Sequence, residues 1–219
     1  MKDMRNSRNR ITLFILTFLS FMLLSGIFRV FICDSFIVSG LSMYPTLHDG
    51  QRVWAFKIGI GARIYTRYDF SDPELHSFRI PGLRRLRKGD IAIFNHPYGV
   101  NHEDISFKIN YVLIKRCAGV PGDTVRVNLS EKCFVPGRGD SIILDSCTFR
   151  QYLHQIEFET GQKLTMDDNH AYYLGKMPIK KYQFTSNWYF FIGDNLTLSR
   201  DSRQFGLVPE SYIIGRIMK

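Results

Sequence analysis

The chain has 219 residues, of which 45% are hydrophobic and 14% aromatic, a composition that excludes a largely disordered protein and allows one compact domain with appendages. Its formal net charge of +9 could serve an anionic membrane surface or a nucleic acid. Because no motif for reading bases is present, we expect no nucleic-acid partner.

A basic segment followed by a long apolar run opens the chain. Residues 1–10 carry four basic side chains against one acidic one, and the stretch ITLFILTFLSFMLLSGI that follows has no charge. Extended to Cys33, the run spans about 34 Å as a helix, enough for a hydrocarbon core of about 30 Å. A cleavable signal peptide would have a shorter apolar region and a small-x-small site after it. The pattern predicts a cytoplasmic basic tail (residues 1–10), a transmembrane anchor (11–33) and an extracytoplasmic domain (34–219).

Beyond the anchor the sequence has the pattern of short strands between turns. The β-branched and aromatic runs are SFIVSG, RVWAF, GDIAIF, INYVLIKRCAGV, TVRVN, SIIL, WYFFIGDN and YIIGRIM. Helical periodicity is weak except in the anchor and over residues 149–158. We therefore predict a mainly β fold.

The first predicted strand that ends at a candidate catalytic side chain is SFIVSGLS. Period-two alternation places Phe36, Val38, Gly40 and Ser42 on one face, so Ser42 emerges at the strand end, before Pro45 turns the chain. A serine before such a turn is, by itself, more typical of an ordinary turn than of a nucleophile.

The second is YVLIKRCAGVPGD, in which Lys115 shares a strand face with Tyr111 and Leu113. A free lysine has a pKa near 10.4 and is almost entirely charged at neutral pH. Apolar surroundings lower that pKa and would make the amine usable as a base. The alternative is a lysine whose stem packs while its amine reaches water.

The third is FIGDNLTLSRDSRQFGLVPE, a hydrophobic strand followed by a dense polar loop. Ser199 offers a hydroxyl that could hold a neutral lysine amine, while Asp201 and Arg203 can pair and stiffen the loop. Taken alone, this segment could be a well-bonded turn.

Together, and in this order, these segments resemble the bacterial type I signal peptidases, membrane-bound serine–lysine endopeptidases that remove leader peptides from exported proteins. SMYPTLHDGQRV is similar to the family's nucleophile box, KGDIAIF to its following strand, IKRCAGVPGDTV to its lysine box and GDNLTLSRDSRQFGLVP to its last box. With the anchor, the resemblance covers most of the chain. It implies a signal-peptidase-like β fold with a smaller β-rich insertion lobe.

The resemblance also implies roles for single residues. Ser42 would be the nucleophile, Lys115 the general base and Ser199 the hydroxyl that orients the lysine, in agreement with the need of a hydroxyl nucleophile for an oriented base. Asp201 and Arg203 match a supporting acidic and basic pair. The positions that match structural ones of the family are Met43, Pro45, Gly193, Asp194 and Asn195.

Gly40 departs from the family pattern, because many members carry serine or threonine there to help stabilise the oxyanion. Ser39 falls on the opposite strand face, so the oxyanion hole would rest on the Ser42 amide and a neighbouring donor. Leu196 is a second departure, standing where arginine often follows Gly-Asp-Asn.

Histidine is the rival base. His48 lies six residues from Ser42 and His96 follows the GDIAIF strand, but neither has a partner carboxylate that the sequence identifies, so a Ser-His-Asp triad is disfavoured. No group of residues has the spacing of metal ligands, and we expect neither metal nor cofactor.

The implied substrates are preproteins with small residues at the first and third positions before the cut. A stretched leader segment would add as a strand beside residues 36–42 or 111–115, with Phe36, Val38 and Leu113 as pocket walls or as plain core. The expected location is the bacterial cytoplasmic membrane, with one span, the N-terminus in the cytoplasm, catalysis outside, and contacts with the bilayer. We expect a monomer.

The segment from about residue 126 to 187 lies where family members carry a variable insertion, and we predict a smaller β-rich lobe there. It contains Cys133 and Cys147, which an oxidising compartment could join or leave free.

Two other functions stay open at this level. The chain could process one dedicated exported substrate, or it could be a non-catalytic, membrane-anchored β module that binds exported peptides. The presence of both Ser42 and Lys115 disfavours the module, because binding requires neither.

Overall fold

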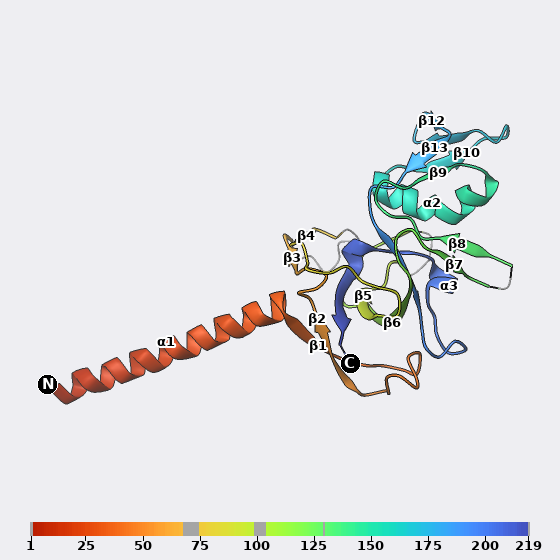
Figure 1. The fold of residues 1–219 in the computed structure, drawn as a ribbon. Helices are drawn as coiled ribbons and strands as arrows, with labels where there is room; N and C mark the ends of the chain where they lie inside the picture. The colour runs from red at the N-terminus through yellow and green to blue at the C-terminus, as the bar shows by residue number, and fades with distance from the viewer. Residues whose placement is uncertain (1, 68–74, 99–103, 129, 219) are drawn as a thin grey trace.

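The computed structural model describes residues 2–67, 75–98, 104–128 and 130–218, with side chains from residue 9 onward. Met1 and Lys219, the ends of the predicted tail and domain, lie outside them. The elements, in chain order, are α1 (Lys2–Phe31), β1 (Cys33–Ile37), β2 (Arg52–Phe56), β3 (Arg63–Tyr65), β4 (Ser77–Arg79), β5 (Ile91–Asn95), β6 (Val112–Gly119), β7 (Thr124–Arg126), β8 (Lys132–Phe134), β9 (Ser141–Ile143), α2 (Ser146–Thr160), β10 (Leu164–Met166), β11 (Tyr172–Leu174), β12 (Met177–Ile179), β13 (Lys181–Gln183), β14 (Trp188–Ile192), α3 (Ser202–Phe205), β15 (Val208–Pro209), the 3₁₀ turn η1 (Glu210–Tyr212) and β16 (Ile213–Ile217) (Figure 1).

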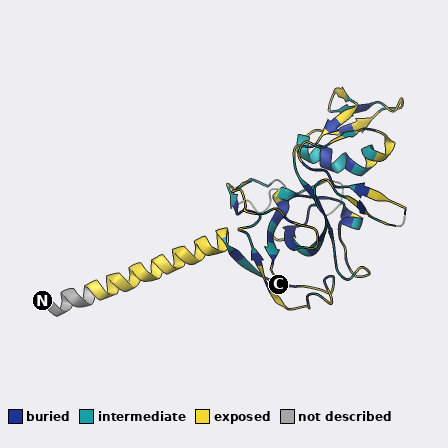
Figure 2. Ribbon diagram, in the orientation of Figure 1, coloured by how far each residue is buried: buried dark blue, intermediate teal, exposed yellow. Residues whose placement is uncertain are grey.

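The N-terminal helix projects away from the rest of the molecule. Its segment Asn9–Phe31 is 23 residues long with a mean hydropathy of 2.3, and no part of it is buried (Figure 2). This helix is long and apolar enough to cross a membrane. It ends at Phe31, two residues before the predicted end of the anchor, because Cys33 pairs with Phe56 and is buried as the first residue of β1.

A seven-stranded antiparallel sheet forms the centre of the domain, and the prediction of a mainly β fold is confirmed. Its strand order is β1-β2-β16-β5-β6-β14-β15. β14 pairs with β6 only from Arg116 onward, so the stretch from Val112 to Lys115 has β5 on one side and, among the described residues, no strand on the other. β1 is an edge strand. In the described part of the sheet, β1 and the start of β6 are therefore two unpaired strand segments, and β15 forms the opposite edge.

Aliphatic side chains fill the layer beneath the segment that follows β1. Val38, Met43 and Leu47 pack there against buried residues of β2 and β5, including Val53 and Ile93. At about 25 cal/mol per Å² of apolar surface, this burial stabilises an otherwise irregular loop. The loop is thereby fixed against the sheet.

A smaller lobe contains α2 and strands β9 to β13, and it lies at the end of the molecule farthest from α1 (Figure 1). The helical periodicity over residues 149–158 corresponds to α2, which is longer because Asp145 caps its first turn and Gly161, with φ of 65°, ends it. Short strands make up most of the rest of the lobe.

The four cysteines are all free. Cys133 is buried in β8, whereas Cys147 is exposed at the start of α2. The structure therefore contains no disulfide between them.

Candidate active site

The loop that carries Ser42 begins earlier than strand alternation predicts. β1 ends at Ile37, because Gly40 adopts φ of +84°, a left-handed conformation that breaks the extended strand. The Gly40 amide donates to Oδ1 of Asp49 at 2.7 Å, which fixes the turn. The prediction of one continuous strand face from Phe36 to Ser42 was wrong. Ser42 lies instead in a loop whose next residue, Met43, is buried in the core.

Lys115 reaches Ser42 from the unpaired stretch of β6. Its Nζ lies 2.5 Å from the Ser42 Oγ, and the residue is only 3% exposed. Burial lowers the pKa of the Lys115 amine below its ordinary value, although the carboxylates of Asp201 and Asp194 oppose the shift. A neutral amine at this distance can take the hydroxyl proton as the oxygen attacks.

Ser199 is buried close behind the nucleophile loop, where Gly193 faces both. A Cβ added to Gly193 would lie 2.1 Å from the Ser199 Oγ and 2.6 Å from the Ser42 carbonyl oxygen, so only glycine fits. The Ser199 Oγ has no hydrogen-bond partner of ordinary geometry in the described part of the chain, although it lies near enough to Asp201 to help lower the pKa of that carboxyl. Its predicted contact with Lys115 stays a prediction.

Asp201 and Arg203 form the pair that the sequence suggests. The carboxylate of Asp201 is fully buried and accepts from the Gly193 amide and from Nε and Nη2 of Arg203, each at 2.9 Å. Burial alone would raise the pKa of Asp201, but these hydrogen bonds outweigh it and hold the pKa below its ordinary value. Arg203 also donates to the Leu196 carbonyl oxygen at 2.9 Å, so the pair fixes the whole polar loop.

Arg116 is a supporting residue that the sequence reasoning missed. Its Nε and Nη2 donate to the two carboxylate oxygens of Asp194 at 2.7 and 2.6 Å, and its Nη1 donates to the Gly89 carbonyl oxygen at 2.8 Å. This bidentate pair ties the strand of Lys115 to the loop after β14. The available signal was the basic residue next to Lys115 in one motif and the acidic Asp194 in the next.

The two backbone polar groups of Ser42 differ in their hydrogen bonding. Its carbonyl oxygen accepts from the Asn195 amide at 3.0 Å, whereas its own amide donates to no group in the described ranges. The Gly40 amide is already engaged by Asp49. Of these two amides, that of Ser42 is the one available to a developing oxyanion.

A small cavity of about 130 Å³ adjoins the reactive pair, with room for roughly four water molecules. Both unpaired strand segments line it, so the sheet is curled enough to bring the end of β1 next to the start of β6. Phe36, Val38 and Leu113 all contribute to its walls, and Val38 belongs to the aliphatic core as well.

The two histidines considered as rival bases make no hydrogen bond to Ser42. His48 is exposed, with its ring edge-on to Tyr44. His96 is buried, its ring stacks on Tyr111 at 4.7 Å between centroids, and its Nδ1 accepts from the Tyr98 amide at 3.2 Å. Their contacts are those of structural residues.

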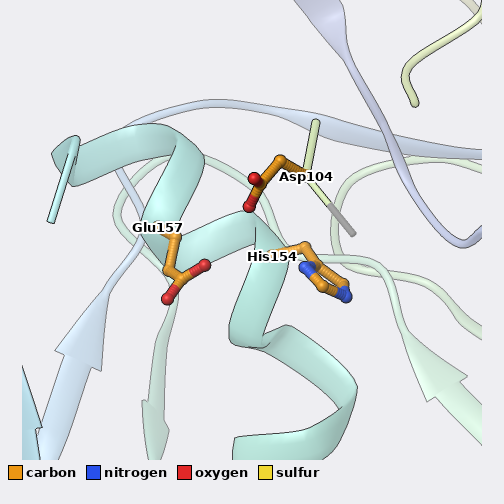
Figure 3. Close-up of side chains that lie close together, drawn as sticks. All are labelled: Asp104, His154 and Glu157. Carbon is orange, nitrogen blue, oxygen red and sulfur yellow. The ribbon is translucent and has the colours of Figure 1, made fainter. Parts of the chain in front are cut away.

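One group of metal-capable side chains occurs among the described residues, although no such spacing is evident in the sequence. Asp104 comes from the loop before β6, while His154 and Glu157 share a face of α2 (Figure 3). Nζ of Lys163 lies 3.1 Å from Asp104 and 3.2 Å from Glu157, so a side-chain cation already bridges the two carboxylates. The group shares no residue with the Ser42 cavity.

Comparison with known proteins decides the family. A family model described as signal peptidase, peptidase S26, matches residues 11–219. The chain belongs to this signal peptidase family. The predicted resemblance and enzyme class are thereby confirmed, and the helix Asn9–Phe31 agrees with a membrane-anchored family.

Several relatives are named signal peptidase I. That of Pseudomonas aeruginosa is 28% identical, with the match covering 87% of this chain and 65% of the relative. Signal peptidase I T of Bacillus subtilis is 29% identical, over 89% of this chain and 76% of the relative. Signal peptidase I of Rickettsia bellii is 31% identical, over 90% and 68%. The chain thus spans about two thirds of the length of the Pseudomonas and Rickettsia relatives.

Proposed function

We propose that this signal peptidase removes N-terminal leader peptides from exported preproteins after a small-x-small motif, with Ser42 as nucleophile and Lys115 as general base. The observation that carries the proposal is the 2.5 Å approach of a buried lysine amine to a serine hydroxyl. Burying a lysine amine lowers the stability of the fold, and a buried lysine with a lowered pKa is typical of a catalytic base.

The chemistry follows from these positions. The neutral Lys115 amine takes the Ser42 proton while Oγ attacks the scissile carbonyl carbon, and the Ser42 amide stabilises the oxyanion. The Lys115 ammonium then gives its proton to the leaving amine, and the peptide bond breaks to leave an acyl ester on Ser42. Lys115 next takes a proton from water while the water oxygen attacks the ester carbon. As the bond between that carbon and the Ser42 Oγ breaks, the Lys115 ammonium gives its proton to Oγ, which restores the free serine and the neutral amine and releases the leader with a new C-terminal carboxyl group. Arg116, Asp194, Asp201 and Arg203 hold the loops in place.

The substrate would bind as an added strand between the end of β1 and the start of β6. Both segments lack a strand partner on the side that borders the cavity, so their backbone groups can pair with an extended peptide. Alternate substrate side chains would then point into the cavity. Its small volume favours side chains such as alanine.

Membrane anchoring supports the choice of substrate. Only Ile32 separates α1 from β1, and Nζ of Lys57 donates to the Arg29 carbonyl oxygen at 2.8 Å, so the helix joins the domain with little slack. In the proposed topology residues 1–10 stay in the cytoplasm and the domain from residue 34 lies outside. Ser42 then works close to the bilayer surface, where a leader still held in lipid presents its end.

Cleavage by the full-length protein in detergent tests the function directly. With a preprotein whose leader ends Ala-x-Ala, the wild type should make a single cut after the second alanine, located by mass spectrometry. Ser42→Ala and Lys115→Ala should each lower the rate by about a thousandfold or more, because they remove the nucleophile or its base. Lys132→Ala, at an exposed lysine of β8, is the matched control and should cut normally.

The other outcomes separate the remaining functions. No cut in folded wild type, across several leaders, would favour a dedicated substrate or a peptide-binding module. A cut that survives Lys115→Ala would mean that another group is the base.

A further inference from the structure

A cleft that catalysis does not use is lined by four arginines. It has a volume of about 730 Å³ and takes its charged lining from Arg79, Arg84, Arg85 and Arg138, opposed by the single carboxylate of Glu210. It shares no residue with the Ser42 cavity. The excess of positive charge in a concave surface makes the cleft suited to an anion.

Part of this charge is not satisfied within the chain. Arg85 makes no hydrogen bond or ion pair with any residue in the described ranges, and the Nε of Arg84 is buried there without a partner. Arg84 does contact Asp90, at 3.2 Å through Nη2. The Glu210 carboxylate accepts a hydrogen bond from Nδ2 of Asn187 at 2.8 Å. Arg79 donates to backbone carbonyl oxygens, including that of Gly61 at 2.7 Å, and Arg138 Nε donates to that of Thr185 at 2.8 Å. These carbonyl groups do not neutralise the two charges, and the exposed Arg85 has guanidinium donors left over for a ligand.

An apolar cavity of about 220 Å³ adjoins the arginine cleft and shares part of its lining. Its walls include Phe56, Ile58 and Met218, and Arg84 and Arg85 line both spaces. A ligand that fills both would need an anionic group joined to a hydrophobic part. Free phosphate has no such hydrophobic part.

Backbone hydrogen bonds place the two spaces beside the end of the membrane helix. The Lys57 amide donates to the Ile32 carbonyl oxygen at 2.9 Å, and the Arg84 amide donates to the Gly59 carbonyl oxygen at 2.8 Å. The arginine turn is thus linked to the helix end through two hydrogen bonds and the short segment 57–59 between them. Leu83 at the tip of this turn is 86% exposed. Figure 1 shows β3 and β4, which precede the turn in the chain, beside the end of α1.

We propose that the arginine cleft binds the headgroup phosphate of an anionic phospholipid, with the first part of its acyl chains against the neighbouring apolar cavity. Arginine suits this ligand because its planar guanidinium pairs with phosphate oxygens in a bidentate way and is weakly hydrated. In this arrangement the exposed Leu83 side chain inserts into the membrane–water interface beside the basic side chains, as the apolar residues of amphipathic surface elements do. The inference rests on the proposed membrane anchoring by α1.

Native mass spectrometry of the full-length protein in neutral detergent tests this site, with phosphatidylglycerol and phosphatidylcholine of identical acyl chains as probes. The double variant Arg84→Gln/Arg85→Gln is compared with Arg87→Gln/Lys88→Gln, which changes the charge equally in the same turn but lines neither space. We expect one phosphatidylglycerol retained by wild type and by the control, and affinity lowered about tenfold or more in the first variant. Arg85→Gln alone, at an exposed side chain with no hydrogen-bond partner among the described residues, should show part of the loss.

Three results would overturn the proposal. Equal loss in both double variants would mean a diffuse basic surface, and equal retention of phosphatidylcholine would mean apolar contact alone. Displacement by inorganic phosphate would mean a site for free anions. Lipid retention is measured independently of cleavage, so an inactive wild type that keeps phosphatidylglycerol would refute the proposed function and leave the lipid site standing. Unchanged cleavage of a soluble peptide by the first variant would verify its fold.

Discussion

In the proposed mechanism a single side chain, that of Lys115, would set the pH range of the activity. Because burial lowers its pKa, the amine loses its proton at a lower pH than an ordinary lysine with a pKa near 10.5. The charged form cannot accept the Ser42 proton, so kcat/KM should be low below the Lys115 pKa, rise as pH increases through it and level off above.

The prediction is a midpoint below 10.5 in a pH profile measured with a peptide substrate free of titrating groups. A midpoint at or above the ordinary lysine value would contradict a buried base. Lys132→Ala, far from the serine in sequence and exposed, should leave the profile unchanged.

Gly193 should tolerate no side chain. In Gly193→Ala the new methyl group would overlap the Ser199 Oγ and approach the Ser42 carbonyl oxygen, so the nucleophile loop must shift. We expect the free energy of unfolding to fall by about 1 to 3 kcal/mol and kcat/KM to fall by about 100-fold. Urea denaturation and initial-rate kinetics measure the two effects. Gly26→Ala, where nothing lies within 4 Å, is the control, and equal behaviour of the two variants would refute the packing argument.

A contact between two side chains could be predicted where both residues lie in the same motif. Asp201 and Arg203 stand two apart, and their ion pair is present. Arg116 was missed because its partner, Asp194, lies 78 positions away, and only the pairing of β6 with β14 brings the two together. The residues around Arg116 and around Asp194 do not show that the two side chains meet in the folded protein.

Strand edges are the elements that would select the substrate. If a leader segment pairs with the unpaired stretches of β1 and β6, its amide groups must alternate between bonded and unbonded positions. A series of peptides with one N-methyl group each should therefore alternate between a KM raised by about tenfold and a nearly unchanged KM as the methyl group moves along the chain. A uniform effect along the series would argue against strand addition.

The position of Ser42 shows where periodicity fails as a guide. Alternation from Phe36 extends a strand to Ser42, yet glycine at position 40 takes a left-handed conformation and ends it. Glycine permits such a turn without requiring it, because its conformation is decided by the Asp49 contact and by burial of Met43. These tertiary contacts cannot be read from the strand pattern.

For the whole molecule, the strands were recognisable but their order was not. The C-terminal β16 lies between β2 and β5, a placement set by packing across the entire chain. The lobe likewise depends on a distant contact. Glu159 at the end of α2 accepts from the Trp188 indole at 2.9 Å and from the Thr185 amide at 2.7 Å, and so ties the lobe to the strand β14.

Cysteine labelling would establish the orientation of the domain. Cys147 is exposed, whereas Cys33, Cys117 and Cys133 are buried, so a maleimide that cannot cross membranes should label one residue in intact spheroplasts if the domain lies outside. Cys147→Ser should abolish the label. Labelling that appears only after lysis would instead place the domain in the cytoplasm.

The short joint between α1 and β1 also bears on how enzyme and substrate meet. If α1 spans the bilayer as proposed, the single residue Ile32 between helix and strand and the pair of Arg29 with Asp34 at 3.0 Å would leave the domain little freedom to swing away from the membrane surface. A preprotein held in the same bilayer by its leader then meets the enzyme by lateral diffusion. The encounter rate would depend on the number of molecules per unit area of membrane, and dilution of the surrounding solution would leave it unchanged.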